Sequence, residues 1–387
     1  MPIGEVFKLK LESLIAGGDA LGRLEGKPVF VKGGAPCETV LCRIVEDKKT
    51  WARAELLEIT EPSPVRVKTA CAFYGKCGGC NLMFVDYNAQ LDIKTSILKD
   101  SFLRIGGLQP PEIEVFPSLP FEYRNRMQFH CFRQNVKNAG SLKFGLVGLD
   151  KEITAVTDCP IAVPGIREVL GGGGKGITLP PDKDRFNVFS KDDVLLNEGG
   201  QQRGKIKLLD KEITMDAGLF FQSNCFMLEK LILELRKIAE SADQNLPMAD
   251  LYCGIGTFAV FLGDMFPKVI LAEENKNAVS LARENLKGKN TEFFALRDTE
   301  WSSNLQSKRF GFTVIDPPRA GLAKKIASTL AQEGSSVLAY VSCDAASLAR
   351  DSKILTGGGY KLARLMLFDF YPQTAHIESL AVFEKNT

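Results

Sequence analysis

The stretch that decides the fold is Asp250-Leu251-Tyr252-Cys253-Gly254-Ile255-Gly256-Thr257-Phe258. An amphipathic helix is predicted before it, over Leu228 to Glu240, and another apolar run follows it. A doubly wound sheet brings backbone close to a nucleotide-like ligand with these parts: an acidic residue at a strand end, a G-x-G turn and a helix. A glycine turn can also serve core packing alone. The stretch predicts an α/β domain of the Rossmann-like type.

Two further predicted strands favour a ligand site at the same edge of the sheet. The apolar run Val269 to Ala272 ends in Glu273, nineteen positions after Gly254. That is the usual distance for a carboxylate that accepts hydrogen bonds from ribose hydroxyls. A third strand, Glu292 to Ala295, leads to Asp298. With a single G-x-G in place of the full dinucleotide fingerprint, the pattern suits S-adenosylmethionine better than NAD.

The next predicted strand ends in Asp316-Pro317-Pro318-Arg319. The prolines stiffen the chain where it leaves the sheet, and Asp316 is expected at the carboxyl edge, where ligands bind. Asp-Pro-Pro also opens the motif of enzymes that methylate amines, in which an aromatic residue comes next. This chain has Arg319 at that position. The sequence therefore argues against methylation of an exocyclic amine.

A cysteine stands where the following strand ends and a helix begins. Ser336 to Val341 is an apolar run, and a helical pattern opens at Ser342-Cys343-Asp344. Free N–H groups at a helix start favour an anion, so we expect the Cys343 thiol to ionise more easily than an ordinary one. The alternative is a small buried hydrophobic residue. His376 and Glu378 lie two residues apart where a turn enters the last strand, so they can share one side.

Residues 1–60 predict a small β-barrel. Short alternating strands separated by glycines recur at Val6–Leu9, Pro28–Val31 and Val40–Val45. The stretch from Gly18 to Arg23 and on to Val31 resembles a TRAM domain, an RNA-binding barrel attached to RNA-modifying enzymes. Because basic and acidic residues are balanced here, a structural or dimerising barrel is the alternative.

Three cysteines form a C-x5-C-x2-C arrangement at Cys71, Cys77 and Cys80. Closely spaced thiols joined by glycines can wrap around one metal centre. A fourth ligand is needed, and Cys159 is the best candidate because a Cys-Pro step commonly closes an iron–sulfur site. Zinc fits the same tetrahedral thiolate set, and the spacing leaves both metals open.

The middle of the chain predicts one helix followed by strands. The helix is expected over Tyr87 to Gly106, and strands with glycine-rich turns are expected from Glu112 to Ala217. Within Phe121 to Arg133, aromatic residues that can stack on bases alternate with arginines that can reach phosphates. The same alternation is typical of any half-buried strand. RNA contact and simple strand packing both fit this stretch.

The composition is that of an ordinary globular protein with room for two or three domains. The chain has 387 residues, 45% hydrophobic and 25% charged residues, and a formal net charge of +2. This charge neither demands nor excludes a nucleic-acid partner, which needs only a local basic face. We expect a cytoplasmic location, no membrane association, and cysteines that serve as ligands or nucleophiles in place of disulfides.

Taken together, these motifs resemble the RNA uracil-5 methyltransferases. The resemblance covers nearly the whole chain and rests on Phe220–Asn224, Asp250–Gly256, Asp316–Gly321, Ser342–Asp351 and His376–Glu378. One departure is clear: the family usually has Asn-Pro after the cysteine, where this chain has Asp344-Ala345. The family's reaction needs a thiolate to add to C6 of uracil and a base to remove the C5 proton.

The resemblance implies a role for each site residue. It implies Cys343 as the nucleophile and Glu378 as the general base. It also implies that S-adenosylmethionine is contacted by Gln222, Tyr252, Glu273 and Asp316, with Asp298 at the adenine. The implied ligands of a 4Fe-4S cluster are Cys71, Cys77, Cys80 and Cys159.

The expected organisation is a barrel over residues 1–60, a central β-rich iron–sulfur domain over 61–215 and a methyltransferase domain over 216–387, with the helix at 87–106 packed on the last. The expected partner is RNA, with 23S rRNA preferred, tRNA as the alternative and a monomeric state favoured. An inactive iron–sulfur protein that only binds RNA is a rival from another class.

Overall fold

The computed structural model describes residues 2–132, 143–180, 183–297, 300 and 309–385. The chain forms two compact units, each assembled from separate stretches of sequence. The first contains residues 1–97, 146–154 and 371–376. The second contains residues 98–145, 155–370 and 377–387.

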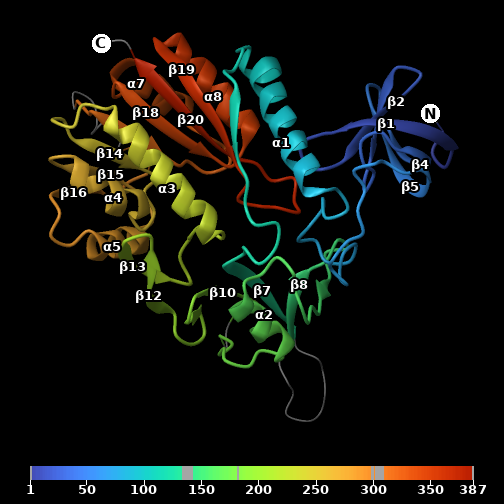
Figure 1. Cartoon of the computed structure of the whole chain (residues 1–387), viewed down its shortest axis with the longest axis horizontal. Coiled ribbons are helices and arrows are strands. Elements are labelled where there is room, and N and C mark those ends of the chain that lie inside the picture. Colours follow the sequence, from blue (N-terminus) through green and yellow to red (C-terminus); the bar gives the residue numbers. More distant parts are fainter. Residues whose placement is uncertain (1, 133–142, 181–182, 298–299, 301–308, 386–387) are drawn as a thin grey trace. The chain divides into compact units, whose positions relative to one another are not determined.

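The first unit begins with a closed five-stranded barrel, drawn in blue in Figure 1. Its strands are hydrogen-bonded in the order β1-β2-β3-β5-β4. Their bounds are β1 Val6–Leu14, β2 Ala20–Leu24, β3 Lys27–Val31, β4 Thr39–Asp47 and β5 Ala52–Glu61. Alternate side chains, Leu9 and Leu11 of β1 and Val29 and Val31 of β3, are buried inside. The prediction of a small N-terminal barrel is confirmed.

The cysteine-rich loop follows the barrel in the same unit. Between β5 and α1 (Tyr87–Ser101), the described chain forms turns and isolated bridges in place of strands. The N–H of Gly78 donates to the Val147 carbonyl at 2.9 Å, where β8 (Lys143–Val147) pairs with β9 (Ile153–Thr154). Backbone hydrogen bonds therefore hold the middle of the loop against residues 146–149.

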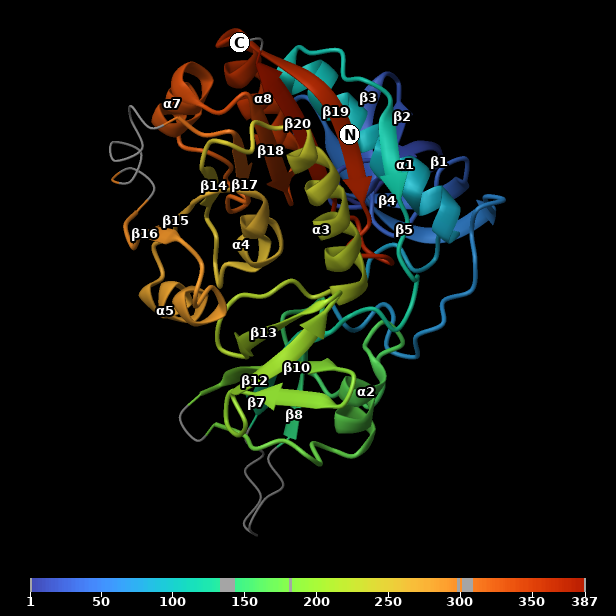
Figure 2. The same ribbon diagram turned by 60° about the vertical axis from the view of Figure 1, so that its left-hand side comes forward.

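The second unit is built on an eight-stranded sheet in the order β16-β15-β14-β17-β18-β20-β19-β6 (Figure 2). β16 through β18 run parallel, and β20 is antiparallel to both of its neighbours. The bounds are β6 Ile113–Phe116, β14 Met248–Leu251, β15 Val269–Ala272, β16 Thr291–Phe294, β17 Phe312–Ile315, β18 Val337–Ser342, β19 Tyr360–Phe368 and β20 Glu378–Lys385. Every residue of β14, β15, β17 and β18 is buried, as expected for parallel strands covered on both faces. The predicted Rossmann-like fold is confirmed.

Helices connect the parallel strands and lie on both faces of this sheet (Figure 2). α3 packs against α4, and α7 packs against α8. The bounds are α3 Cys225–Glu240, α4 Thr257–Leu262, a 3-10 turn η2 Gly263–Met265, α5 Lys276–Asn285, α7 Lys324–Glu333 and α8 Ala345–Gly357. Strand ends and helix starts therefore meet at one edge of the sheet, where ligands bind in folds of this type. In the described ranges, no helix combines the length and the apolar character needed to cross a membrane.

The helix predicted over residues 87–106 is present in two parts. α1 ends at Ser101, and the chain continues as a π-helical turn, η1 (Phe102–Gly106). Within the second unit, η1 packs against α8. A Cβ on Gly106 would come within 3.0 Å of the Ala349 carbonyl oxygen, so a side chain there would push the two helices apart.

A smaller sheet of five strands has the order β11-β10-β7-β8-β9, and its strands β11, β10 and β7 belong to the second unit. Its remaining bounds are β7 Arg126–Phe132, β10 Arg185–Lys191 and β11 Val194–Asn197, and a hairpin of β12 (Arg203–Leu208) and β13 (Lys211–Asp216) follows. The region was expected to contain only strands and turns, and α2 (Pro164–Gly171) is an exception. It was missed because a helix of eight residues offers only Ile166, Val169 and Leu170 as an apolar stripe.

Candidate active site

Five of the predicted site residues meet at the carboxyl edge of the large sheet. The residues that directly follow β14, β15, β17 and β18 are Tyr252, Glu273, Asp316 and Cys343. Because β20 is antiparallel, its first residue, Glu378, comes to the same edge. Ser342 pairs with Ser379, so the next step along the two strands sets Cys343 beside Glu378. The structure thus brings together the thiol and the carboxyl group that the sequence singled out.

The turn after Cys343 is set by a helix cap. Asp344 is the N-cap of α8, and its side chain accepts a hydrogen bond from the Ser347 N–H at 2.7 Å. Asp and Asn are about equally good N-caps, and the next position tolerates Pro because its N–H has no partner in the helix. Asp344-Ala345 therefore preserves the turn that Asn-Pro provides in the family.

The thiol of Cys343 ionises less readily than an ordinary one. Burial raises its pKa to about 11, and the negative charges of Glu378 and Asp316 act in the same direction, against the positive charge of Arg319. The expectation of an easily ionised thiol is therefore wrong for the protein without ligands. It failed because burial of the thiol, which the local sequence does not reveal, outweighs the effect of a helix start.

Glu378 and Asp316 form a pair of carboxyl groups next to the thiol. Glu378 is 3% exposed, and burial raises its pKa well above the ordinary value, with the charge of Asp316 acting in the same direction and Arg319 opposing it. Burial also raises the pKa of Asp316, against the hydrogen bond from Gln222 Nε2, which lies 3.5 Å from Asp316 Oδ2. Because the two negative charges repel, one of the carboxyl groups holds a proton more tightly than the other.

Arg319 is a charged residue of this edge that the sequence did not single out as part of the site. It was used only to exclude the motif of amine-methylating enzymes, yet its charge acts on both Cys343 and Glu378. The available signal was a cation three positions after a strand-end carboxylate, next to two prolines that fix its direction.

The loop after β14 has an uncommon backbone that leaves space above it. Tyr252, Gly254 and Gly256 all have positive φ, of 61°, 54° and 79°. A Cβ on Gly256 would lie 3.2 Å from Ala282 of α5, so this glycine permits close helix packing. A Cβ on Gly254 would meet nothing within 4 Å. Gly256 thus serves packing, whereas Gly254 lies on the open side.

The carboxylates beside this loop hold its backbone. Glu273 accepts from the N–H of Gly254 at 3.1 Å and from the N–H of Asn275 at 2.8 Å. A carboxylate has about four acceptor sites, so Glu273 keeps capacity for two more donors. Asp250, 1% exposed, accepts from the Ala259 N–H at 3.0 Å and has its pKa raised to about 7 by burial. Asp250 therefore fixes the start of α4.

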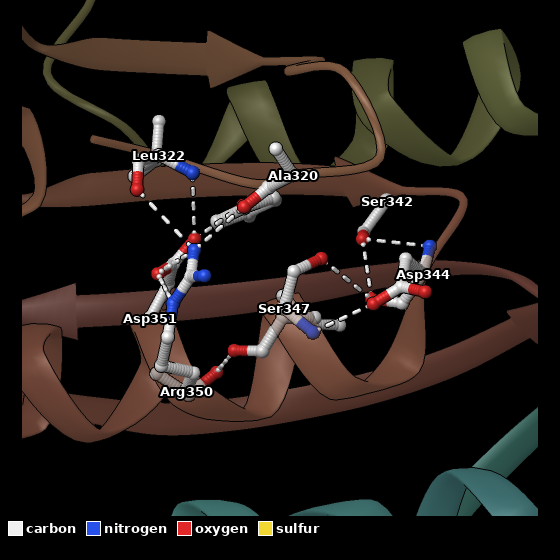
Figure 3. A network of polar contacts seen from close by, with 10 residues as sticks. Ala320, Leu322, Ser342, Asp344, Ser347, Arg350 and Asp351 are labelled. Atoms are coloured by element: carbon white, nitrogen blue, oxygen red, sulfur yellow. Dashed lines mark hydrogen bonds and ion pairs between the residues drawn. The ribbon is translucent and has the colours of Figure 1, made fainter. Parts of the chain in front are cut away.

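A network around Asp351, drawn in Figure 3, fixes the loop that follows Asp316. Asp351 is fully buried, and its Oδ2 accepts from the N–H of Leu322 at 2.8 Å and from the Tyr340 hydroxyl at 2.9 Å. The backbone of the loop, the strand β18 and the helix α8 are thereby tied to one carboxylate.

Arg350 completes the network from the same helix. Its Nε donates to Asp351 Oδ1 at 2.8 Å, and its Nη2 donates to the Ala320 carbonyl at 2.8 Å (Figure 3). Gly321 has φ of 71°, and a Cβ there would lie 2.5 Å from Asp351 Oδ2. Glycine is therefore required at this position, where the loop after β17 lies against α8.

Comparison with known proteins identifies the family. The model described as tRNA (Uracil-5-)-methyltransferase matches residues 201–386, and the TRAM domain model matches residues 3–57. A protein of Treponema denticola described as "Uncharacterized RNA methyltransferase" is 32% identical over 98% of this chain and 99% of its own length. The chain belongs to the RNA uracil-5 methyltransferase family.

One further relative of this methyltransferase and one solved structure of similar fold are named for different RNA substrates. The 23S rRNA (uracil(1939)-C(5))-methyltransferase RlmD of Pseudomonas entomophila is 29% identical over 99% of this chain and 95% of its own. The tRNA (uracil-54, C5)-methyltransferase of Pyrococcus abyssi, solved in complex with S-adenosyl-L-homocysteine, has a TM-score of 0.75 at 24% identity. The comparison covers 97% of this chain and 100% of that one, and shows a shared fold.

The residues of this methyltransferase fit the S-adenosylmethionine that its family uses. Gln222 is 8% exposed, and its Oε1 is buried with no hydrogen-bond partner among the described residues. Glu273 retains acceptor capacity, and the open side of Gly254 leaves room for a ligand at the loop. Asp298, expected near the adenine, lies outside the described residues.

The four predicted metal ligands lie in two units. Cys71, Cys77 and Cys80 belong to the first unit and are partly exposed, whereas Cys159 is buried in the second. Backbone N–H groups of Phe73 and Gly79 donate to the sulfurs of Cys71 and Cys77, both at 3.4 Å. In the described parts of the chain, no three His, Cys, Asp or Glu side chains are arranged to hold a metal ion. A metal centre is therefore not shown.

Proposed function

We propose that this methyltransferase transfers a methyl group from S-adenosylmethionine to C5 of a uridine in RNA, with Cys343 as nucleophile and Glu378 as general base. The observation that carries the proposal is the adjacency of these two residues, because Cys343 directly follows β18 and Glu378 begins β20, its neighbour in the sheet. They lie at the edge of the sheet where the loop after β14 begins. A thiol and a carboxyl group on one side of a nucleotide-binding sheet are what this reaction needs.

Each residue has a distinct task in the reaction. The thiol of Cys343 gives its proton to the Asp316 carboxylate, so that Glu378 stays ionised for the later step, and the sulfur adds to C6, which makes C5 enolate-like. The methyl group that C5 takes up is supplied by S-adenosylmethionine. Glu378 then removes the C5 proton, and the electron pair of that C–H bond restores the C5–C6 double bond as the C6–S bond breaks. The raised pKa of Glu378 makes its carboxylate a stronger base for this step.

Asp316 is proposed to contact the edge of the uracil ring. Its raised pKa favours the protonated form, which can donate a hydrogen bond to the oxygen that gains charge when sulfur adds to C6. Gln222, Tyr252 and Glu273 are proposed to hold the cofactor together with Asp316. Asp298 is proposed to bind its adenine.

The RNA of the large ribosomal subunit is the proposed substrate. RlmD of Pseudomonas entomophila, which matches this chain over nearly the full length of both proteins, is named for 23S rRNA. The TRAM match adds a barrel of the kind that is attached to RNA-modifying enzymes. Transfer RNA is the second candidate, favoured by the likeness in fold to the Pyrococcus abyssi tRNA enzyme. In either RNA the target uridine has to leave its stack to reach Cys343.

In vitro methylation tests the proposal. Purified protein, labelled S-adenosylmethionine and transcripts of 23S rRNA or tRNA are incubated, and 5-methyluridine is mapped by mass spectrometry. We expect product in 23S rRNA, none with Cys343→Ala, and unchanged product with Cys37→Ala, a matched change at an exposed cysteine. Product in tRNA alone would select the second candidate. Cofactor and RNA binding without product would favour the inactive RNA-binding protein.

A 4Fe-4S cluster on Cys71, Cys77, Cys80 and Cys159 is proposed with a structural or RNA-positioning role. Its support is the thiolate set and the N–H groups directed at two of the sulfurs, a common feature of cluster sites. Iron and sulfide analysis of protein purified without oxygen tests it. We expect both elements in the wild type and in Cys37→Ala but not in Cys77→Ala, and zinc in their place would contradict the cluster.

The organisation proposed for the whole chain is a barrel over 1–60, a central domain over 61–215 and a methyltransferase domain over 216–387. A monomer in the cytoplasm is proposed. Size-exclusion chromatography with light scattering measures the mass in solution. A mass of twice that of one chain would contradict the monomer.

A further inference from the structure

A cavity of about 370 Å³ lies in the second unit on the smaller sheet, between residues of β7, β10 and the chain just beyond them. It shares no residue with the edge that carries Cys343. The residues that form it include Gln128, His130, Lys183, Arg185, Asn187 and Glu198. Ligand-binding cavities of proteins begin at about 300 Å³, so the space accommodates one small planar group.

The floor of this cavity is rigid because it consists of paired strands. Arg185 of β10 lies opposite His130 of β7, and Asn187 lies opposite Gln128. Residues directly opposite in an antiparallel pair share one face, so these four side chains project from the same side. Phe129, between the two on β7, is fully buried on the other side. The strand pleat therefore separates a polar face from the core of this sheet.

Asn187 is the feature that indicates a ligand. Its side chain is 6% exposed, and its Oδ1 is buried with no hydrogen-bond partner in the described part of the chain. Burying an amide without a partner costs about 1–3 kcal/mol, so such a group is rarely kept without use. Its carbonyl needs a donor, and a ligand with an N–H group can supply one.

The charges around the cavity balance. The backbone N–H of Asn187 donates to Glu198 Oε2 at 2.8 Å, and Lys183 Nζ lies 3.3 Å from Glu198 Oε1. Glu198 is thereby engaged, and the remaining charges on the lining, Arg185 and Asp184, are of opposite sign. Because the positive and negative charges of the lining cancel, the cavity does not favour a bare phosphate. Its side-chain amides can form hydrogen bonds with the polar edge of a base, and its imidazole can stack on the face of that base.

We propose that this cavity binds an unstacked RNA base, which presents an N–H group to Asn187 and lies away from the uridine to be methylated. Gln128 reads the same edge of the base, and His130 or Arg185 stacks on its face. The site gives the polar face of β7, which carries Gln128 and His130, a binding role beyond strand packing. It rests on the proposed function, because the ligand is part of the RNA substrate.

Two variants separate binding from folding. Asn187→Leu replaces an unpartnered amide by an apolar side chain of similar size, so we expect no loss of thermal stability in the free protein. Gln128→Ala changes an exposed side chain. Gln201→Ala, also an exposed glutamine but not part of the cavity, is the matched control.

The test is RNA affinity measured by fluorescence anisotropy on a 23S rRNA fragment that the wild type methylates. Asn187→Leu and Gln128→Ala are each expected to weaken binding about tenfold, which corresponds to about 1.4 kcal/mol, and Gln201→Ala to leave it unchanged. Wild-type affinity in both cavity variants would overturn the proposal. So would a fall in melting temperature of Asn187→Leu that accounts for its weaker binding, together with unchanged binding by Gln128→Ala.

Two further outcomes are distinct from these. If the wild type neither binds nor methylates any RNA offered, the proposed function fails, and the cavity proposal fails with it. If free AMP, CMP, GMP or UMP competes with the RNA for the wild type but not for Gln128→Ala, the cavity binds the base as such, and the strongest competitor identifies it.

Discussion

At Cys343, burial and the charges of Glu378 and Asp316 oppose ionisation, and among the described residues the guanidinium of Arg319 is the charge that favours it. With a pKa of about 11, the group is a neutral thiol at neutral pH. A neutral thiol is a poor nucleophile and also resists oxidation. The proposed mechanism therefore requires bound substrate and cofactor to change this environment so that the thiolate forms.

Alkylation of the thiol tests this state. Because the pKa of Cys343 is raised to about 11, the rate of alkylation by iodoacetamide should keep rising as pH increases beyond about 8.5, where an ordinary thiol is already half ionised. The modification of each cysteine is followed by mass spectrometry at several pH values. Fast alkylation of Cys343 near neutral pH, with no rise above it, would show an activated thiolate.

The neighbouring charges predict the direction of change in two variants. Arg319→Met removes the positive charge that lowers the pKa of Cys343, so alkylation at a fixed alkaline pH should slow. Glu378→Gln removes a negative charge that raises the pKa of Cys343, so alkylation of Cys343 at the same pH should become faster. Equal rates in both variants and the wild type would mean that burial alone sets the pKa.

At the scale of elements, α8 links Cys343 to the loop after β17. Asp344 caps the helix next to Cys343, and Asp351, two turns later, binds the loop backbone and Tyr340 of β18. A shift of α8 would move the thiol and the Asp316 loop together. The position of α8 therefore determines where Cys343 and the loop after β17 lie.

The cap can be tested by substitution. Asp344→Ala removes the acceptor for the Ser347 N–H and should lower the free energy of unfolding by about 1 kcal/mol. The double variant Asp344→Asn with Ala345→Pro restores the family's usual pair and should be as stable as the wild type, since both positions accept those residues. Chemical denaturation measures both. A double variant less stable than Asp344→Ala would show that the turn differs from the one described.

The Asp351 network predicts a larger effect. Asp351→Asn removes a buried charge and at least one acceptor, and should lower the free energy of unfolding by about 3 kcal/mol. Tyr340→Phe, which removes only the hydroxyl donor, should lower it by about 1 kcal/mol. Thermal and denaturant unfolding give the two values. If the tyrosine variant lost as much as the aspartate variant, the carboxylate would not be the centre of the network.

At the scale of the whole molecule, local patterns predicted the elements but not their neighbours in space. The run Asp250 to Phe258 was enough to predict strand, turn and helix, because each of these depends on nearby residues. The insertion of β20 between β18 and β19 depends on contacts between distant residues, and it alone brings Glu378 to Cys343. The resemblance to a family supplied that pairing before the structure did.

The same limit applies to charge and to domain boundaries. The pKa of Cys343 depends on its burial and on the charges of Glu378 and Asp316, all set by residues far away in sequence, so a helix-start argument gave the wrong direction. Residues 146–154 and 371–376 join the first 97 residues in one compact unit, although no local pattern marks them as its parts. Motifs identify which residues take part, and the sheet decides how they affect one another.

Covalent trapping is the measurement that tests the central claim most directly. The protein is incubated with S-adenosylmethionine and an RNA in which the target uridine carries fluorine at C5, which cannot be removed as a proton. The account predicts a protein–RNA adduct that survives denaturation, maps to Cys343 and is absent in Cys343→Ala. An adduct on another cysteine, or methylation of ordinary RNA by Cys343→Ala, would contradict it.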